Sequence, residues 1–225
     1  MITPLLNKIH LGDCLEFMRG LPDKSIDLVL TDPPYGMDFQ SSYRIIQHKK
    51  IENDSNLDWI NEWFDLLAQK VKPDAMLYIF CSFHNIDIFK QACQKYFPVK
   101  NILIWQKNNT GMGDLFGDYA PQYEMVLYCN LGGKHLTGRR DSNILCFPRT
   151  QNELHPTQKP VDLIKYLASK SLAKGVCLDS FSGSGTTALA CHDLGLDFIC
   201  IEKDPDYHAA SVKRLEQHQR QLKLL

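Results

Sequence analysis

The sequence predicts an α/β fold built as one domain. Short apolar runs of strand length alternate along the chain with segments whose apolar residues recur every three or four positions, which is the spacing of a helix. A glycine-rich segment at 180–187 joins a predicted strand to a helix, as in nucleotide-binding α/β units. The 225 residues, 44% of them hydrophobic, suffice for one domain with its own core.

The elements are predicted in chain order from these patterns. Residues 8–13 form a short strand ending in Gly-Asp, and Asp13 is placed to cap the short helix 14–19. The next strand, 26–31, is a compact apolar run. Further strands are predicted from apolar runs at 75–81, 99–105, 123–129, 175–179 and 196–202. Further helices are predicted from helical periodicity at 57–71, 85–96, 161–173, 188–194 and 205–219.

The most informative segment is Asp32-Pro33-Pro34-Tyr35, directly after strand 26–31. Proline cannot donate to a sheet ladder and makes the preceding residue extended, so the strand must end here. The carboxyl ends of strands in an open α/β sheet are where ligands bind. The segment offers a carboxylate, carbonyls with fixed directions and an aromatic face, which together suit an exocyclic amine on a flat nucleobase. Taken alone, it could also be a strand-ending turn with an incidental tyrosine.

A second constellation lies in the C-terminal half. Asp179 ends a predicted strand and precedes a loop whose two glycines, Gly183 and Gly185, let the backbone pass close to a ligand. Glu202 ends the next strand. Its distance in sequence from Gly183 is close to the ~20 residues that separate the glycines from the ribose-binding acid in nucleotide-binding units. The loop is not Gly-x-Gly-x-x-Gly and has no Walker lysine, which disfavours pyrophosphate. A nucleoside with a non-phosphate tail, S-adenosylmethionine, is the expected cofactor.

The order of these motifs resembles the amino-group DNA methyltransferases of the permuted β class. That class has its catalytic Asp-Pro-Pro-Tyr in the N-terminal half and its cofactor motif Phe-x-Gly-x-Gly in the C-terminal half, here Asp32–Tyr35 and Phe181–Gly185. A third family motif, His-Pro-Thr-Gln-Lys-Pro, lies between them at 155–160. The resemblance covers 8–35 and 153–207 by motif. It implies one three-layer, Rossmann-like methyltransferase domain over 1–225, with circularly permuted motifs and a mixed seven-stranded sheet containing one antiparallel strand.

The resemblance also implies a role for individual residues. The catalytic residues would be Asp32, Pro33, Pro34 and Tyr35. The cofactor-binding residues would be Asp13, Asp32, His155, Thr157, Lys159, Asp179, Phe181, Gly183, Gly185, Thr186, Thr187 and Glu202. Asp13 would contact the adenine ring of the cofactor, although a plain helix cap remains open. Lys159 can meet the carboxylate at the methionine end, and a helix N-terminus also favours an anion. His155 is expected only to order its loop, and Glu202 could be a solvated strand end.

The expected reaction is methyl transfer from S-adenosylmethionine to an exocyclic ring nitrogen. Asp32 and the Pro33 carbonyl would accept the two N–H bonds of the amine, and Tyr35 would stack on the base. A paired base cannot reach such a pocket, so it must be flipped out of the duplex. In the family, Asp at the first motif position is typical of enzymes that methylate N6 of adenine. Methylation of N4 of cytosine stays open as an alternative. An RNA methyltransferase and a non-catalytic DNA-binding subunit with this fold are the alternatives.

Positive charge concentrates in two spans, 37–56 and 107–150, which are predicted to contact DNA. Their basic residues suit phosphate contact or ordinary surface charge. The expected partner is duplex DNA, and the short spans also suggest a homodimer. A restriction endonuclease partner is left open.

Composition narrows the setting of the protein. The net charge of −1 excludes a chain coated in positive charge, so any DNA-binding surface must be local. The eight cysteines form no Cys-x-x-Cys pair, which predicts no metal site and a reducing compartment. No apolar run approaches the roughly 20 residues that cross a membrane, and the N-terminus lacks a signal-peptide pattern. We therefore expect a cytoplasmic protein without a membrane partner.

Overall fold

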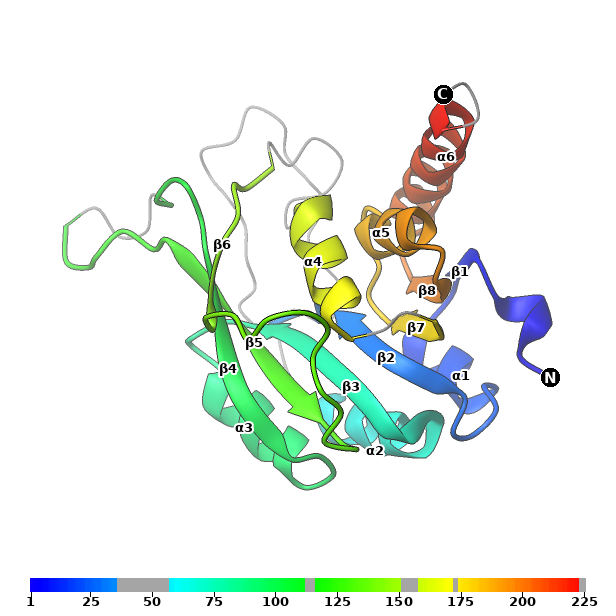
Figure 1. Ribbon diagram of the computed structural model, residues 1–225, viewed down its shortest axis with the longest axis horizontal. Helices are drawn as coiled ribbons and strands as arrows, with labels where there is room; N and C mark the ends of the chain where they lie inside the picture. The colour runs from blue at the N-terminus through cyan, green and yellow to red at the C-terminus, as the bar shows by residue number, and fades with distance from the viewer. Residues whose placement is uncertain (36–56, 112–115, 151–157, 172–173, 223–225) are drawn as a thin grey trace.

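A computed structural model describes residues 1–35, 57–111, 116–150, 158–171 and 174–222. Its centre is an eight-stranded sheet in the order β1-β8-β7-β2-β3-β5-β4-β6 (Figure 1). The strands are β1 (Lys8–Leu11), β2 (Ile26–Thr31), β3 (Val71–Cys81), β4 (Val99–Gln106), β5 (Tyr123–Asn130), β6 (Ile144–Cys146), β7 (Val176–Asp179) and β8 (Asp197–Glu202). The helices are the 3₁₀-helix η1 (Thr3–Leu5), α1 (Cys14–Arg19), α2 (Ile60–Lys70), α3 (Ile86–Gln94), α4 (Val161–Ser171), α5 (Thr186–Leu194) and α6 (Pro205–Leu222).

The sheet is mixed and contains one antiparallel strand, as the family resemblance implies. Strand β5 is antiparallel to both of its neighbours, β3 and β4, and the other strand pairs are parallel. The predicted number of strands is wrong by one, because β6 adds an eighth at the edge through parallel pairing of Ile144–Cys146 with Ile104–Gln106. Three residues are too short to show an alternating pattern, so this strand has no signal in the sequence.

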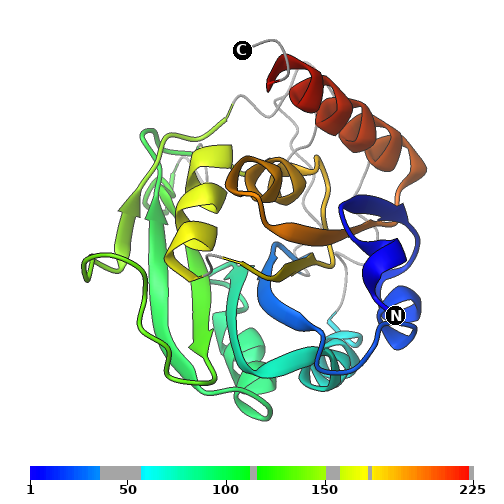
Figure 2. The ribbon, with the colours of Figure 1, turned by 45° about the vertical axis from the view of Figure 1, so that its right-hand side comes forward.

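Helices cover both faces of the sheet. Figures 1 and 2 show α1, α2 and α3 on one face and α4, α5 and α6 on the other, which makes three layers. Each face has its own buried cluster. On the first face, Trp63 and Phe64 of α2 are fully buried, and the Trp63 indole donates to Ser180 Oγ at 3.1 Å. This bond ties α2 to the start of the glycine-rich segment.

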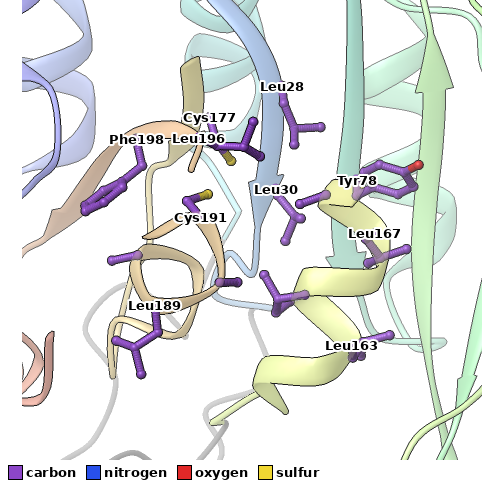
Figure 3. Packing of buried hydrophobic residues seen from close by; sticks show 14 of the residues in the cluster. Leu28, Leu30, Tyr78, Leu163, Leu167, Cys177, Leu189, Cys191, Leu196 and Phe198 are labelled. Atoms are coloured by element: carbon purple, nitrogen blue, oxygen red, sulfur yellow. The ribbon is translucent and has the colours of Figure 1, made fainter. Parts of the chain in front are cut away.

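On the second face, leucines of α4 and α5 pack against the central strands (Figure 3). Leu163 and Leu167 lie near Leu30 of β2 and Tyr78 of β3, and all four side chains are buried. Truncating one such leucine to alanine costs typically about 2–5 kcal/mol. The central strands β2 and β7, which carry the two motifs at their carboxyl ends, are therefore held from both faces.

Four further expectations from the sequence concern the two basic spans, the cysteines and membrane-spanning helices. The span 37–56 lies outside the described residues, which end at Tyr35 and resume at Leu57. The span 107–150 contains β5 and β6 of the sheet, and its contact with DNA stays a prediction. The eight cysteines are free thiols. Within the described ranges, no helix combines the length and apolar character needed to span a bilayer.

Candidate active site

The two motifs lie side by side at one edge of the sheet. Strands β8, β7 and β2 are consecutive neighbours and parallel, so their carboxyl ends lie together. Glu202 and Asp179 are the last residues of β8 and β7, and Asp32 comes directly after β2. Thr31 donates its hydroxyl to Asp179 Oδ1 at 2.7 Å, which links the last residue of β2 directly to the last residue of β7. Segments about 150 residues apart in the chain thus form adjoining walls of one site.

The Asp32–Tyr35 loop is fixed by hydrogen bonds. The Tyr35 hydroxyl donates to Asp32 Oδ1, and the Lys159 ammonium donates to Asp32 Oδ2. The side-chain amide of Asn85, at the start of α3, donates to the Tyr35 carbonyl. Pro33 is buried, and Tyr35 packs partly against the core. The Asp32 carboxylate is therefore held in one orientation at the end of β2.

A row of alternating charges extends from Asp32. The Lys159 ammonium, on a side chain only 6% exposed, lies 3.0 Å from Glu124 Oε2 as well as against Asp32. Lys107 Nζ lies 2.8 Å from the other oxygen, Glu124 Oε1, and 5.1 Å from the centre of the Trp105 ring. Two lysines thus balance two carboxylates, which is what a mostly buried ionic cluster requires.

Burial and charge shift the pKa values of this cluster in opposite directions. Burial raises the pKa of Asp32, and the Glu124 charge adds to the rise although Lys159 opposes it. Burial also acts to raise the pKa of Glu124, but Lys159 and Lys107 outweigh it and lower the pKa to about 2. Burial acts to lower the pKa of Lys159, but Asp32 and Glu124 outweigh it and raise the pKa. Lys159 and Glu124 therefore stay charged at neutral pH.

The glycine-rich segment needs glycine at two positions. Gly183 and Gly185 have φ values of +49° and +75°, in the left-handed region, and Gly185 is the N-cap of α5. A Cβ on Gly185 would also lie 3.0 Å from Ser211 Cβ and 3.1 Å from Ile9 Cδ1. Backbone geometry and packing by α6 and β1 both disfavour a side chain here.

Two charged side chains hold this segment from outside. Glu202 Oε2 accepts the backbone N–H of Gly183 at 2.7 Å. Arg214 of α6 donates to the Ser184 carbonyl at 2.9 Å, and its guanidinium also reaches Ser184 Oγ at 3.3 Å and Thr186 Oγ1 at 3.2 Å. Burial raises the pKa of Glu202, which the N–H groups of Asp204 and Gly183 oppose. Both contacts fix the loop at the N-terminus of α5.

Asp179 is a buried acid between the two motifs. Its Oδ1 accepts from Thr31 and from the Phe181 backbone N–H at 3.1 Å. Burial raises the pKa of Asp179 to about 6, although hydrogen bonds from Thr187, Thr31 and Phe181 oppose the rise. With a pKa of about 6, the Asp179 carboxyl group binds a proton as the pH falls below neutrality.

The environment of Phe181 fits a nucleoside cofactor. Its ring packs against Trp59 and Trp63, with ring centres 5.3 and 5.6 Å away. Beside it, the buried Trp59 Nε1 and Ser182 Oγ have no hydrogen-bond partner among the described residues. Buried polar atoms in native proteins are nearly always satisfied. An apolar wall with two unsatisfied polar atoms beside it suits a ligand with a flat ring and hydroxyl groups.

The predicted cofactor residues are not all placed by the structure. Asp13 caps α1, accepting the Leu15 N–H at 2.9 Å, as the alternative interpretation expected, and a contact with the adenine ring stays a prediction. Lys159 contacts Asp32 and Glu124, and its contact with the cofactor carboxylate stays a prediction. His155 and Thr157 lie outside the described residues.

The sequence analysis did not identify three residues that contribute to the site. They are Glu124, its partner Lys107, and Arg214. Glu124 is the second residue of an antiparallel strand, so it begins β5 at the edge where the parallel strands end. A lone charge at the start of an apolar run was the available signal. Arg214 lies among several polar residues of α6, and no pattern marks it.

Comparison with known proteins identifies the class. The family model described as a DNA methylase, N6_N4_Mtase, matches residues 26–213. The match spans most of the chain, and the chain belongs to this family of DNA methyltransferases. The methyl donor of the family is S-adenosylmethionine.

Individual relatives are similar along nearly the whole chain. DNA adenine methyltransferase YhdJ of Escherichia coli (strain K12) is 27% identical over 245 residues, which cover 92% of this chain and 82% of YhdJ. Type II methyltransferase M2.MboI of Moraxella bovis is 29% identical over 241 residues, which cover 93% of this chain and 87% of the relative.

Two solved structures extend the comparison. The M1.HpyAVI–SAM complex aligns with a TM-score of 0.70 and 27% identity, covering 92% of this chain and 99% of that one. The cytosine-N4-specific PvuII DNA methyltransferase aligns with a TM-score of 0.75 and 18% identity, covering 94% of this chain and 89% of that one, which shows a shared fold.

Proposed function

We propose that this protein methylates the exocyclic N6 amine of adenine at specific sites in duplex DNA. The observation that carries the proposal is the position of Asp32, an oriented carboxylate that adjoins the glycine-rich segment through the Thr31–Asp179 hydrogen bond. The relative YhdJ, which is named a DNA adenine methyltransferase, supports adenine over cytosine.

Each residue of the Asp32–Tyr35 loop has a part in the proposed mechanism. An exocyclic amine is a poor nucleophile because its lone pair is delocalised into the ring. Asp32 and the Pro33 carbonyl accept its N–H bonds, which localises the lone pair and orients it. Asp32 also stabilises the positive charge that develops on the nitrogen. Tyr35 stacks on the base, which must leave the duplex to reach this loop.

The cofactor is proposed to bind along the glycine-rich segment. S-adenosylmethionine, when bound, supplies a methyl group on a sulfonium sulfur. Phe181 and the unsatisfied Ser182 Oγ would contact its nucleoside, and the backbone freed by Gly183 and Gly185 would allow close approach. Glu202 would accept from the ribose hydroxyls, and Asp13, Asp179, Thr186 and Thr187 complete the proposed set. Lys159, His155 and Thr157 are proposed for the methionine end.

The test incubates the protein with methyl-labelled S-adenosylmethionine and, in separate reactions, duplex DNA or RNA of mixed sequence. Label recovered in N6-methyladenine supports the proposal, and label in N4-methylcytosine corrects the base. Label in RNA but not in duplex DNA overturns the substrate. Mapping of the modified positions defines the recognised site.

We further propose partners and a cellular location for the protein. The spans 37–56 and 107–150 are proposed to contact DNA, and sedimentation with and without DNA tests for a homodimer. An endonuclease with the same recognition site, sought among neighbouring genes, tests for a restriction partner. Fractionation of cells tests the expected cytoplasmic location.

A further inference from the structure

Both oxygens of Asp32 are already occupied in this structure. Tyr35 donates to one of them and Lys159 to the other. A carboxylate oxygen can accept two hydrogen bonds, so the target amine would either share an oxygen of Asp32 with one of these donors or take that donor's place. Both donors are part of a mostly buried cluster, and a buried ammonium or hydroxyl that loses its acceptor is strongly destabilised.

Glu124 lies within reach of both donors. Its Oε2 is 3.0 Å from Lys159 Nζ and 3.4 Å from the Tyr35 hydroxyl. The Lys159 ammonium already lies between the two carboxylates, over the Phe80 ring at 5.1 Å. A small shift of the ammonium toward Glu124 would free Asp32 Oδ2 without leaving either lysine or carboxylate unpaired.

Glu124 is oriented and ionised in a way that suits the transfer of the Lys159 ammonium from Asp32 to Glu124. Lys107 occupies its other oxygen, Oε1, at 2.8 Å, so Oε2 remains directed at Lys159 and Tyr35. The lowered pKa of Glu124 keeps it ionised, whereas the pKa of Asp32 is raised. The exchange has an electrostatic benefit as well, because a cation held on Asp32 would repel the charge that develops on the target nitrogen.

We propose that Glu124 is a positioning residue that accepts the Lys159 ammonium while the target amine takes its place on Asp32. This inference rests on the proposed function, since it needs Asp32 to bind the amine. Glu124 itself touches neither the base nor the cofactor in this scheme and acts through Lys159 and Tyr35.

The test compares the wild type with Glu124→Gln, which keeps the shape of the side chain and removes its charge. We expect kcat to fall at least tenfold, with the KM for DNA and the Kd for S-adenosylmethionine changed by less than about threefold. Glu124→Asp keeps the charge and should recover part of the lost kcat. If Glu124→Gln does not fold, Glu124→Asp carries the test through a lower kcat at unchanged Tm. Asp74→Asn, which breaks the remote Asp74–Lys134 ion pair, is the matched control and should leave kcat unchanged.

A pH profile separates positioning from a structural role. Lys159, Glu124 and Tyr35 act on the pKa of Asp32, and the charge of Asp32 in turn acts on Cys81 and Asp179. Removing the Glu124 charge leaves Lys159 paired with Asp32 alone. Both effects favour the ionised carboxylate, so the acidic limb of kcat/KM should move to lower pH. A structural defect would lower the rate without moving this limb.

The outcomes distinguish the two proposals. An unchanged kcat in Glu124→Gln, or a lower kcat with an unmoved acidic limb, overturns the role of Glu124 while Asp32→Asn remains inactive. Full turnover in Asp32→Asn, or no methyl transfer by the wild type, overturns the proposed function, and the role of Glu124 falls with it.

Discussion

The hydroxyl of Thr31 and the carboxylate of Asp179 join the two halves of the site through a hydrogen bond of 2.7 Å. The bond is buried, and it connects the residue before the Asp32–Tyr35 loop to the residue before the glycine-rich segment. The relative position of Asp32 and the glycine-rich segment therefore depends on the register of β2 and β7, in which Val29 pairs with Leu178.

The first prediction concerns Asp32. Asp32→Ala should lower kcat at least about 100-fold, because a preorganised acceptor is removed from the developing charge. Turnover is measured with labelled cofactor, and the Tm confirms that the variant is folded. Turnover near the wild-type value in a folded variant would contradict the assignment.

The second prediction uses two glycines with similar backbone angles. Gly185 and Gly195 flank α5 with φ values of +75° and +65°, but of these two only Gly185 has neighbouring atoms within 4 Å of the place where a Cβ would lie. Gly195→Ala should cost about 1–2 kcal/mol of unfolding free energy, because an L-residue is strained in the left-handed conformation. Gly185→Ala should cost about 1–3 kcal/mol more from overpacking and weaken cofactor binding. Denaturant unfolding and titration calorimetry measure the two effects, and equal costs would contradict the packing argument.

The third prediction concerns the contact between α6 and the glycine-rich segment. Arg214→Met keeps the aliphatic stem and removes the donors to Ser184 and Thr186. Hydrogen bonds from charged groups contribute about 1.5–3 kcal/mol, so the Kd for S-adenosylmethionine should rise about tenfold or more. Arg220→Met, on the exposed side of the same helix, is the control and should bind normally. An unchanged Kd in Arg214→Met would show that the loop holds its shape without α6.

The fourth prediction concerns the pH dependence of stability. The pKa of Asp179 is raised from 3.8 to about 6 in the folded protein, so the folded state binds the proton more tightly than the unfolded state. This contribution to stability is complete below about pH 4 and is lost as pH rises through about 6. Asp179→Asn removes it. The stability of the wild type relative to Asp179→Asn should fall by up to about 3 kcal/mol between pH 4 and 7, measured by urea unfolding. A rise over that range would refute the raised pKa.

Much of the fold follows from local sequence patterns. The strands at 26–31 and 123–129 and the helix at 205–219 are marked by their own residues, and the structure has β2, β5 and α6 there. Helix α5 begins at Thr186, two residues before the predicted start, because Gly185 serves as its N-cap. Strand β6 was missed because its three residues are strand only through their pairing with β4.

Only those residues of the site that belong to local sequence motifs could be predicted from the sequence. Asp32 and the glycine-rich segment were found because each is a distinctive local pattern. The pairing of Lys159 with Asp32 and Glu124 depends on tertiary structure, since Lys159 is 127 residues from Asp32 in sequence. No local rule indicates which carboxylate a distant lysine will contact, and the role of Glu124 emerges only when β5 is placed antiparallel beside β3.

The pairing of β1 with β8 has a consequence for how the protein is made. Lys8–Leu11, near the start of the chain, lies at one end of the strand order, and its neighbour there is β8, which begins at Asp197. During synthesis β1 cannot pair with β8 until the chain through Glu202, about 190 residues further on, has left the ribosome. Contacts of such long sequence separation form slowly. Until β8 has been synthesised, the backbone N–H and C=O groups of β1 therefore lack the strand partner that they have in the folded sheet.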